Sequence, residues 1–324
     1  MKLSIITINY NNAAGLERTL NSVLDQSYGE IEHIIADGAS TDNSVNVIKE
    51  YVRKVEQMQK SFEQERGKND ERMNVVWVSE PDKGIYNAMN KGLEIALGRR
   101  VVNADHTSSL ISLNAQRSTL NESLCDYIQI LNSGDILAAP DVTERMVAAL
   151  ESLSTKRSTL NEDAVSILYG NMLKKDYTTG KIIVKSREVE YSLRQYFSST
   201  MNHDCCYIRR DVYEKYGLYD ENLKIVSDWK WFLQVIGLGN VKPVYADIDV
   251  TIFDAGGISE SNLTLRNQER RQVLEELLPP AILTDYDAHA FEIEQMKRMR
   301  RHHLYGLVYF MERVLFKLEK WHIL

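Results

Sequence analysis

Short apolar runs alternate with longer stretches in which apolar residues recur every three or four positions along the N-terminal part of the chain. Residues 3–8 (LSIITI) form a continuous apolar run, typical of a strand buried on both faces. Residues 12–26 carry apolar residues at helical spacing, and the run at 31–36 repeats the strand pattern. A second helical stretch at 44–58 and a third strand-like run at 75–79 follow. This alternation predicts an α/β sheet with right-handed crossovers, in which ligands bind at the carboxyl ends of the strands.

An acidic residue follows three of the predicted strands. Asp37 comes after HIIA, Asp82 after VVWVSEP, and Asp135 after YIQILNSG. Asp is a common turn former, so each position also has an ordinary structural explanation. Because the strand ends of such a sheet meet at one edge, we expect the three acids to share one crevice rather than to close three independent turns.

The remaining sequence predicts additions to this sheet. Two polar segments, at about 59–74 and 99–125, have the character of insertions. Residues 166–184 contain two strand-like runs around TTG, which is typical of a hairpin, and the pattern later becomes helical. We therefore expect a catalytic domain over 1–260 and a C-terminal helical region over 261–324.

Composition narrows the class of protein. The formal net charge of −7 argues against a general nucleic-acid binder. No run of about 18 or more apolar residues is present, and the start MKLSIITINYNN is too short and too polar for a signal peptide. Three cysteines give no disulfide framework, so we expect a reducing, cytoplasmic setting. The first strand also lacks the glycine fingerprint of dinucleotide-binding folds, which disfavours a dehydrogenase.

Five motifs in order resemble family 2 glycosyltransferases of the GT-A fold: SIITINYNN, IIADGASTDNS, SEPDKGIYNAMNKGLEIALG, ILNSGDIL and SDWKWF. The resemblance covers about residues 3–260 and implies a mostly parallel, Rossmann-like sheet flanked by helices. It implies inverting transfer of a sugar, with a divalent metal, Mg²⁺ or Mn²⁺, on the donor diphosphate. It also implies a nucleotide-sugar donor, UDP-linked, and a glycan or lipid-linked acceptor in polysaccharide biosynthesis.

The resemblance assigns roles to individual positions. Asp135 matches the acid that holds the metal, and Asp228 matches the catalytic base. Departures from the family pattern are Ser133-Gly134, where a further acid is common, Asn87, where Asp is common, and Asp204, where Gln is frequent. The following residues are expected to bind or border the donor: Thr7, Asn9, Tyr10, Asp37, Asp82, Lys83, Ser133 and Gly134.

The chemistry of these side chains agrees with the resemblance. Mg²⁺ and Mn²⁺ take carboxylate oxygens and leave room for phosphates and water, so Asp135 alone is an adequate protein ligand. Asp228 opens SDWKWF, where it can act as a base for an acceptor hydroxyl or cap the helix. His203 and Trp229 are candidates for the acceptor side, and each also has a structural explanation in the core. The glycine turn DAGGIS at 254–259 is either a lip over the donor or a connection.

The C-terminal segment differs from the acidic average. Residues 290–324 are amphipathic and helical, with Lys297, Arg298, Arg300 and Arg301 close together. This helix packs on the catalytic domain, forms a homodimer, or lies on an anionic membrane surface at the inner face of the membrane. A second function class, a non-catalytic module that binds a sugar nucleotide or a glycan, stays open because the NSGD element carries a single acid.

Overall fold

The computed structural model describes residues 1–66, 73–111, 124–159, 164–175, 182–186, 188–189, 192–253, 262–301 and 305–320. They form two compact units, Met1–Glu269 and Arg270–Leu324. The boundary therefore falls later than residue 260, where the sequence pattern predicted it. The segment 254–259, proposed as a lip, lies outside the described residues.

The first half of the sheet is parallel, as predicted from the apolar runs. Strands β1 (Leu3–Asn9), β2 (Ile31–Asp37), β3 (Met73–Ser79) and β6 (Tyr127–Ile130) lie in the order β3-β2-β1-β6, and each adjacent pair is parallel. Every residue of β1 is buried. Because all four strands point the same way, their carboxyl ends reach one edge of the sheet.

The second half of the sheet is mixed. Strand β10 (Cys206–Arg209) is antiparallel to both β6 and β8 (Ile167–Lys175), whereas β11 (Val244–Phe253) is parallel to β8. Two short strands, β7 (Ile136–Leu137) and β9 (Ile182–Lys185), pair antiparallel with β11 and β8. The predicted hairpin is thus β8 and β9, and the fold class is confirmed as α/β.

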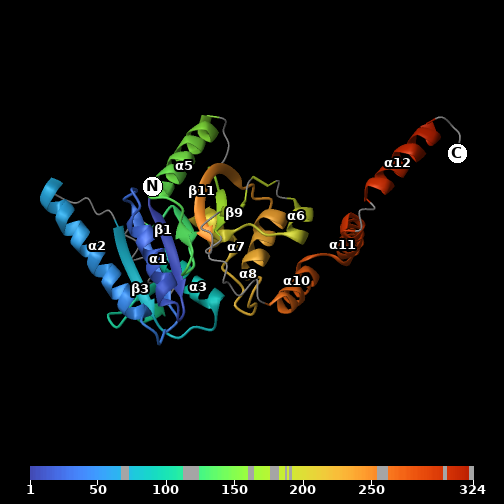
Figure 1. The fold of residues 1–324 in the computed structure, drawn as a ribbon. Coiled ribbons are helices and arrows are strands. Elements are labelled where there is room, and N and C mark those ends of the chain that lie inside the picture. The colour runs from blue at the N-terminus through green and yellow to red at the C-terminus, as the bar shows by residue number, and fades with distance from the viewer. Residues whose placement is uncertain are drawn as a thin grey trace. The chain divides into compact units, whose positions relative to one another are not determined.

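Helices cover both faces of the parallel half (Figure 1). The alternating side chains of β1 explain this, since Leu3 and Ile5 join a core with residues of α1 and α2, while Ile6 meets α3. The helical elements of the first unit are α1 (Ala13–Leu24), α2 (Ser44–Arg66), α3 (Ile85–Ala96), α5 (Val142–Thr159), α6 (Leu193–Ser198), the 3₁₀ turn η1 (His203–Cys205), α7 (Arg210–Tyr216), α8 (Ser227–Phe232) and the π-helical η2 (Leu233–Leu238).

The predicted insertions have different structures. The first, at 59–74, extends α2 to Arg66. The second, at 99–125, begins with an antiparallel hairpin of β4 (Arg100–Val102) and β5 (Ser108–Leu110). This hairpin contacts the end of β3, where the Ser79 amide donates to the His106 carbonyl at 2.9 Å.

Helix α10 (Leu263–Leu277) crosses the boundary, and the second unit continues with α11 (Pro280–Arg301) and α12 (Tyr305–Lys320). Many apolar side chains of helix α12 are exposed. Their exposed fractions lie between 40% and 67% for Leu307, Val308, Tyr309, Phe310, Met311, Val314, Leu315 and Phe316. No helix among the described residues is long and apolar enough to pass through a bilayer.

The contact of α3 with β1 yields a stability prediction. A Cβ added at Gly92 would overlap Cγ2 of Ile6, a side chain with no exposed surface, so the Gly92→Ala variant must displace one element from the other. We expect the free energy of unfolding to fall by about 1–3 kcal/mol, measured by urea denaturation with tryptophan fluorescence. Gly306→Ala is the control, because a Cβ there meets open space. Equal midpoints for the two variants would contradict this packing.

Candidate active site

A buried carboxylate joins the carboxyl ends of the first three strands. Asp37 ends β2 and is 2% exposed. Its Oδ1 accepts from Asn9 Nδ2 at 2.8 Å and from Ser40 Oγ at 2.6 Å. Its Oδ2 accepts from Ser79 Oγ at 2.7 Å and from the Ser40 amide at 3.0 Å. Asp37 thus ties β1 and β3 to the turn that follows β2.

Two further predicted residues lie beside this turn. A Cβ added at Gly38 would overlap Asp82 Oδ2 and approach the ring of Tyr10, so both side chains lie against Gly38. Asp82 Oδ1 accepts from the Gly84 amide at 2.9 Å, and Gly84 has a φ of 125°, which favours glycine. Tyr10 is 65% exposed. The structure therefore brings Asp82 and Tyr10 to the turn that follows Asp37, whereas a crevice shared by Asp37, Asp82 and Asp135 stays a prediction.

The side chain of Thr7 does not point into this crevice. It has no exposed surface, and its Oγ1 lies 3.0 Å from Nε2 of the buried His33. The donor-side role expected for Thr7 therefore does not fit its hydroxyl. Lys83 is exposed in the turn before α3, and its amide donates to Asn87 Oδ1 at 3.2 Å.

Helix α1 holds the turn that carries the single acid of the NSGD element. Thr19 Oγ1 accepts from the Gly134 amide at 2.9 Å and donates to the Asp135 carbonyl at 2.7 Å. Asn12, the N-cap of α1, donates from Nδ2 to the Ser133 carbonyl at 3.0 Å. Gly134 has a φ of 114°, a conformation that side chains disfavour. These bonds fix Asp135, which is 4% exposed, beside the end of β6.

A third group of side chains surrounds the predicted base. Asp228 lies in the first turn of α8. Its Oδ2 lies 3.5 Å from Nδ1 of His203, and its Oδ1 lies 2.9 Å from the hydroxyl of Tyr86 in α3. Nε2 of His203 lies 3.1 Å from Nδ2 of Asn132, three residues before Asp135. Asn132 and His203 therefore connect the NSGD turn to the base.

Nearby charges and burial shift the pKa values of Asp228 and His203 in opposite directions. Burial raises the pKa of Asp228, but the His203 imidazole and the Tyr86 hydroxyl outweigh it and hold that pKa below its ordinary value. Burial lowers the pKa of His203, and the nearby carboxylates of Asp228, Asp204 and Asp135 outweigh it, so that this pKa is raised. Asp228 is therefore a carboxylate at neutral pH, the form that a general base requires.

Trp229 is a core residue. It is 1% exposed, and its Nε1 donates to the Tyr196 carbonyl at 2.8 Å. The indole has no open face for a sugar, so the acceptor-side role expected for Trp229 does not fit its position.

Three contributors to the site were missed by sequence reasoning. Tyr86 contacts the base across 142 positions, and Thr19 lies on a helix that showed only an apolar pattern. Glu269 of α10 is 6% exposed and accepts from the amides of Lys224, Ile225 and Val226 at 2.7, 2.9 and 3.3 Å. It fixes the loop that leads into α8. Only Tyr86 had a signal, its place in the motif KGIYN.

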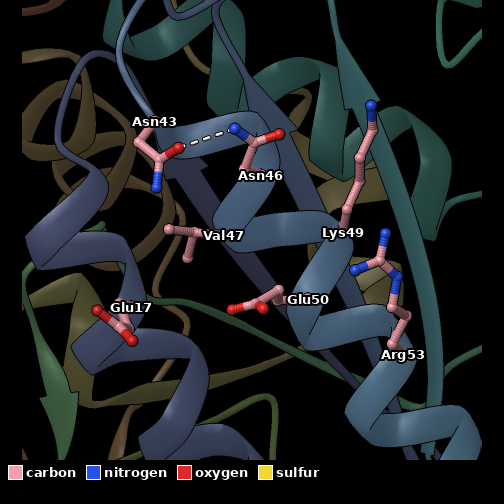
Figure 2. A pocket seen from close by; sticks show the side chains of 7 residues that line it. All are labelled: Glu17, Asn43, Asn46, Val47, Lys49, Glu50 and Arg53. Atoms are coloured by element: carbon pink, nitrogen blue, oxygen red, sulfur yellow. Dashed lines mark hydrogen bonds between the residues drawn. The ribbon is translucent and has the colours of Figure 1, made fainter.

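One surface depression lies away from this site. A surface depression of about 350 Å³ lies between α1 and α2 (Figure 2). It contains none of the predicted site residues and is lined by Glu17, Asn43, Asn46, Val47, Lys49, Glu50 and Arg53. Within the described ranges, no group of three or more His, Cys, Asp or Glu side chains is arranged to hold a metal by itself.

Solved structures share this fold. A crystal structure of Staphylococcus aureus TarS matches with a TM-score of 0.52 and 13% identity, covering 89% of this chain and 42% of that chain. The mannosyltransferase PcManGT from Pyrobaculum calidifontis, solved with GDP-Man and Mn²⁺, matches with a TM-score of 0.52 and 15% identity, covering 90% and 69%. At such identities the similarity shows the fold alone, which is that of GT-A glycosyltransferases.

Sequence comparison shows similarity to glycosyltransferases. Residues 4–106 match the family described as Glycosyl transferase family 2. An uncharacterized glycosyltransferase of Mycobacterium tuberculosis is 28% identical over 259 residues, 79% of this chain and 76% of that protein. The putative teichuronic acid biosynthesis glycosyltransferase TuaG of Bacillus subtilis is 33% identical over 156 residues, 47% of this chain and 54% of that protein. The fold is therefore of GT-A type, and the N-terminal part of the chain is similar to family 2 glycosyltransferases.

Glu269 yields a prediction for the loop before the base. Glu269→Gln replaces a carboxylate oxygen by an amide group that faces backbone donors, so we expect a loss of about 1–3 kcal/mol in the free energy of unfolding. Glu275→Gln in the same helix is the matched control, since its exposed pair with Arg271 contributes about 0–1 kcal/mol. Calorimetry of both variants checks this, and a similar small effect at the two sites would show that Glu269 does not hold the loop.

Proposed function

We propose that the protein transfers a sugar from a nucleotide-sugar to an acceptor hydroxyl with inversion at the anomeric carbon. The observation that carries this proposal is the placement of Asp228. Its carboxylate is ionised, partly buried and linked through His203 and Asn132 to the turn of Asp135. A base and a diphosphate-side acid held at one edge of the sheet are what a single displacement requires.

In the proposed reaction, Asp228 accepts the proton of the acceptor hydroxyl. The acceptor oxygen bonds to the anomeric carbon while the bond from that carbon to the diphosphate oxygen breaks. The electron pair of the broken bond leaves with the nucleoside diphosphate. A base at this position contributes about 10²–10⁴-fold to the rate. One displacement inverts the anomeric configuration and needs no covalent enzyme intermediate.

The donor crevice is formed by Asp37, Asp82 and Tyr10 in this proposal. The exposed ring of Tyr10 offers an apolar face beside two carboxylates, which suits a nucleobase and its ribose. Asn9 and Ser40 donate hydrogen bonds to the Asp37 carboxylate. The carboxylate is therefore held in place before the nucleotide-sugar binds. Lys83 extends from the adjoining turn and would offset diphosphate charge.

The residues present fit a divalent cation that the donor completes. Asp135 supplies one carboxylate, and Mg²⁺ or Mn²⁺ in nucleotide sites takes one or two carboxylates together with phosphate oxygens and water. When bound, such a cation would neutralise charge on the departing diphosphate. PcManGT with GDP-Man and Mn²⁺, and TarS, solved with UDP-GlcNAc, support a metal and a nucleotide-sugar for this fold. We favour a UDP-linked donor and a glycan or lipid-linked acceptor.

The alternative, a non-catalytic binding module, is motivated by the single acid of NSGD. Its donor crevice would be the same. The two functions would differ in their need for the side chains around Asp228. A binding module gains nothing from an ionised Asp228 whose two carboxylate oxygens both have polar contacts. Turnover therefore separates the two functions, whereas nucleotide binding does not.

We further propose that α12 contacts an anionic membrane surface and brings the enzyme to a lipid-linked acceptor. From 290 to 324 the sequence has seven Lys or Arg and four Asp or Glu, against a net charge of −7 for the whole chain. Sixteen helical residues span about 24 Å, less than a hydrocarbon core of about 30 Å, so α12 would lie in the interface. The reaction would then take place at the inner face of the membrane.

The two carboxylates predict different losses. Asp135→Asn should weaken metal-dependent donor binding by about tenfold or more, because the cation loses its protein ligand. Asp228→Asn should leave donor affinity unchanged and slow turnover by about 10²–10⁴-fold. Isothermal titration with UDP and Mn²⁺, and nucleotide release from UDP- and GDP-sugars, measure the two effects. If Asp228→Asn keeps near-normal turnover, Asp228 is not the base.

The membrane proposal predicts that two exposed phenylalanines of α12 contribute to vesicle binding. Phe310→Ser with Phe316→Ser removes side chains that are 64% and 67% exposed, and should reduce binding to phosphatidylglycerol vesicles by about tenfold or more. Phe291→Ser is the matched control, because Phe291 is 65% exposed but lies in α11. Co-sedimentation measures the bound fraction. Equal binding of the three proteins rejects a membrane role for α12, and a dimer lost only in the double variant would assign the helix to self-association.

A further inference from the structure

Four polar side chains, three from separate helical elements and one from the loop after β6, form one connected row. Asn132 follows β6, His203 opens η1, Asp228 lies in α8, and Tyr86 lies in α3. The contacts are 3.1 Å from Asn132 Nδ2 to His203 Nε2, 3.5 Å from His203 Nδ1 to Asp228 Oδ2, and 2.9 Å from Tyr86 Oη to Asp228 Oδ1. The imidazole therefore bridges the NSGD turn and the base with both ring nitrogens.

Another histidine of the same unit, the fully buried His33, shows what a purely structural imidazole looks like in this protein. His33 has no exposed surface, and its two nitrogens meet the hydroxyls of Thr7 and Tyr51 at 3.0 and 2.7 Å. Burial lowers the pKa of His33 to about 3, so it stays neutral. The side chain of His203 is 17% exposed and faces a carboxylate, whose own side chain is 18% exposed. His203 therefore belongs to the open, charged part of the site.

We propose that His203 is a positioning residue for the glycosyl transfer: it orients the carboxylate of Asp228 and fixes its distance from the turn of Asp135. The inference rests on the proposed function, and it differs from the expected contact of His203 with an acceptor or a metal. Nδ1 of His203 lies 3.5 Å from Asp228 Oδ2, at ion-pair distance, while the hydroxyl of Tyr86 donates to Oδ1 at 2.9 Å. Each carboxylate oxygen thereby has one lone pair committed, which limits the directions from which an acceptor hydroxyl can approach.

Asn132 contacts the second ring nitrogen of His203, Nε2. Asn132 Oδ1 is buried and has no hydrogen-bond partner among the described residues. Rotating this amide by 180° exchanges Nδ2 and Oδ1, so Asn132 can donate to a neutral His203 or accept from a protonated one. The connection between the NSGD turn and the base therefore persists in both charge states of the imidazole. In the transfer, the hydroxyl proton goes to Asp228, and His203 has the same number of protons before and after.

Two substitutions test the roles of the two ring nitrogens of His203 one at a time. The amide of Asn at position 203 can replace Nδ1 of the imidazole, and the longer Gln can replace Nε2. His203→Asn therefore keeps a donor to Asp228, and His203→Gln keeps the contact with Asn132. We expect His203→Gln to lower kcat by about 10²-fold, and His203→Asn to lower it much less, with the KM for the donor unchanged in both. Nucleotide release from UDP-GlcNAc, UDP-glucose and GDP-mannose with Mn²⁺ is the assay.

The pH profile provides a readout that a merely structural role would not move. The acids Asp228, Asp204 and Asp135 act on His203, and the imidazole together with the Tyr86 hydroxyl holds the pKa of Asp228 low. Without the imidazole the pKa of Asp228 rises, so the acidic limb of kcat/KM should shift to higher pH in His203→Gln. Equal rates and equal limbs in wild type, His203→Asn and His203→Gln would overturn the proposal while the transferase function stands.

A second measurement is independent of turnover. In the full chain with ¹⁵N-labelled histidine, the His203 resonance should titrate above about 6.5, the ordinary value for histidine, and its midpoint should fall in Asp228→Asn. The His203→Asn variant assigns the signal. An unchanged midpoint in Asp228→Asn overturns the pairing even if no donor is turned over. If wild type turns over none of the sugars but this shift is present, the pairing stands and the proposed function fails for these donors.

Discussion

The carboxyl ends of β1, β2 and β3 meet at one buried carboxylate, and the position of the rest of the site follows from that meeting. Asp37 is accessible to almost no water, so each oxygen needs protein donors, and Asn9, Ser40 and Ser79 supply them. The donors come from both neighbouring strands and the following turn. A shift in the pairing of any of these strands would leave a buried charge without partners, so the edge of the sheet has a single arrangement.

A backbone hydrogen bond connects this edge of the sheet to the NSGD turn. The Ser133 amide donates to the Ile8 carbonyl at 3.0 Å, which ties the NSGD turn to β1. Thr19 and Asn12 then fix the turn from α1. Asn132 and His203 continue the connection to Asp228, whose loop is held by Glu269. The turn after β2, the NSGD turn and Asp228 are thus connected by hydrogen bonds and one ion-pair contact, which sets their spacing.

Sequence patterns predicted the parts of this assembly that follow from local rules. The apolar runs gave the parallel strands, and turn acids after them gave Asp37, Asp82 and Asp135, because strand periodicity and strand-end placement are local properties. Contacts such as Tyr86 with Asp228 join residues far apart in the sequence, and no local pattern contains them. Trp229 was misplaced because an aromatic residue beside an acid has the same sequence signature in a sugar site and in a core. The antiparallel direction of β10 could not be predicted either, since a strand's direction depends on its connections rather than on its residues.

One departure from the family pattern is explained by its neighbours. Asn87 stands where the resemblance to the family leads one to expect Asp. Its Nδ2 donates to Glu221 Oε2 at 2.8 Å, while Asn90 Nδ2 donates to Oε1 at 2.9 Å. An Asp at position 87 would set two carboxylates about 3 Å apart, and both could not stay ionised. The amide is therefore the side chain that permits Glu221 to be held at the end of α3. The same helix carries Tyr86, whose hydroxyl contacts Asp228, so the amide at position 87 also helps to hold the helix that reaches Asp228.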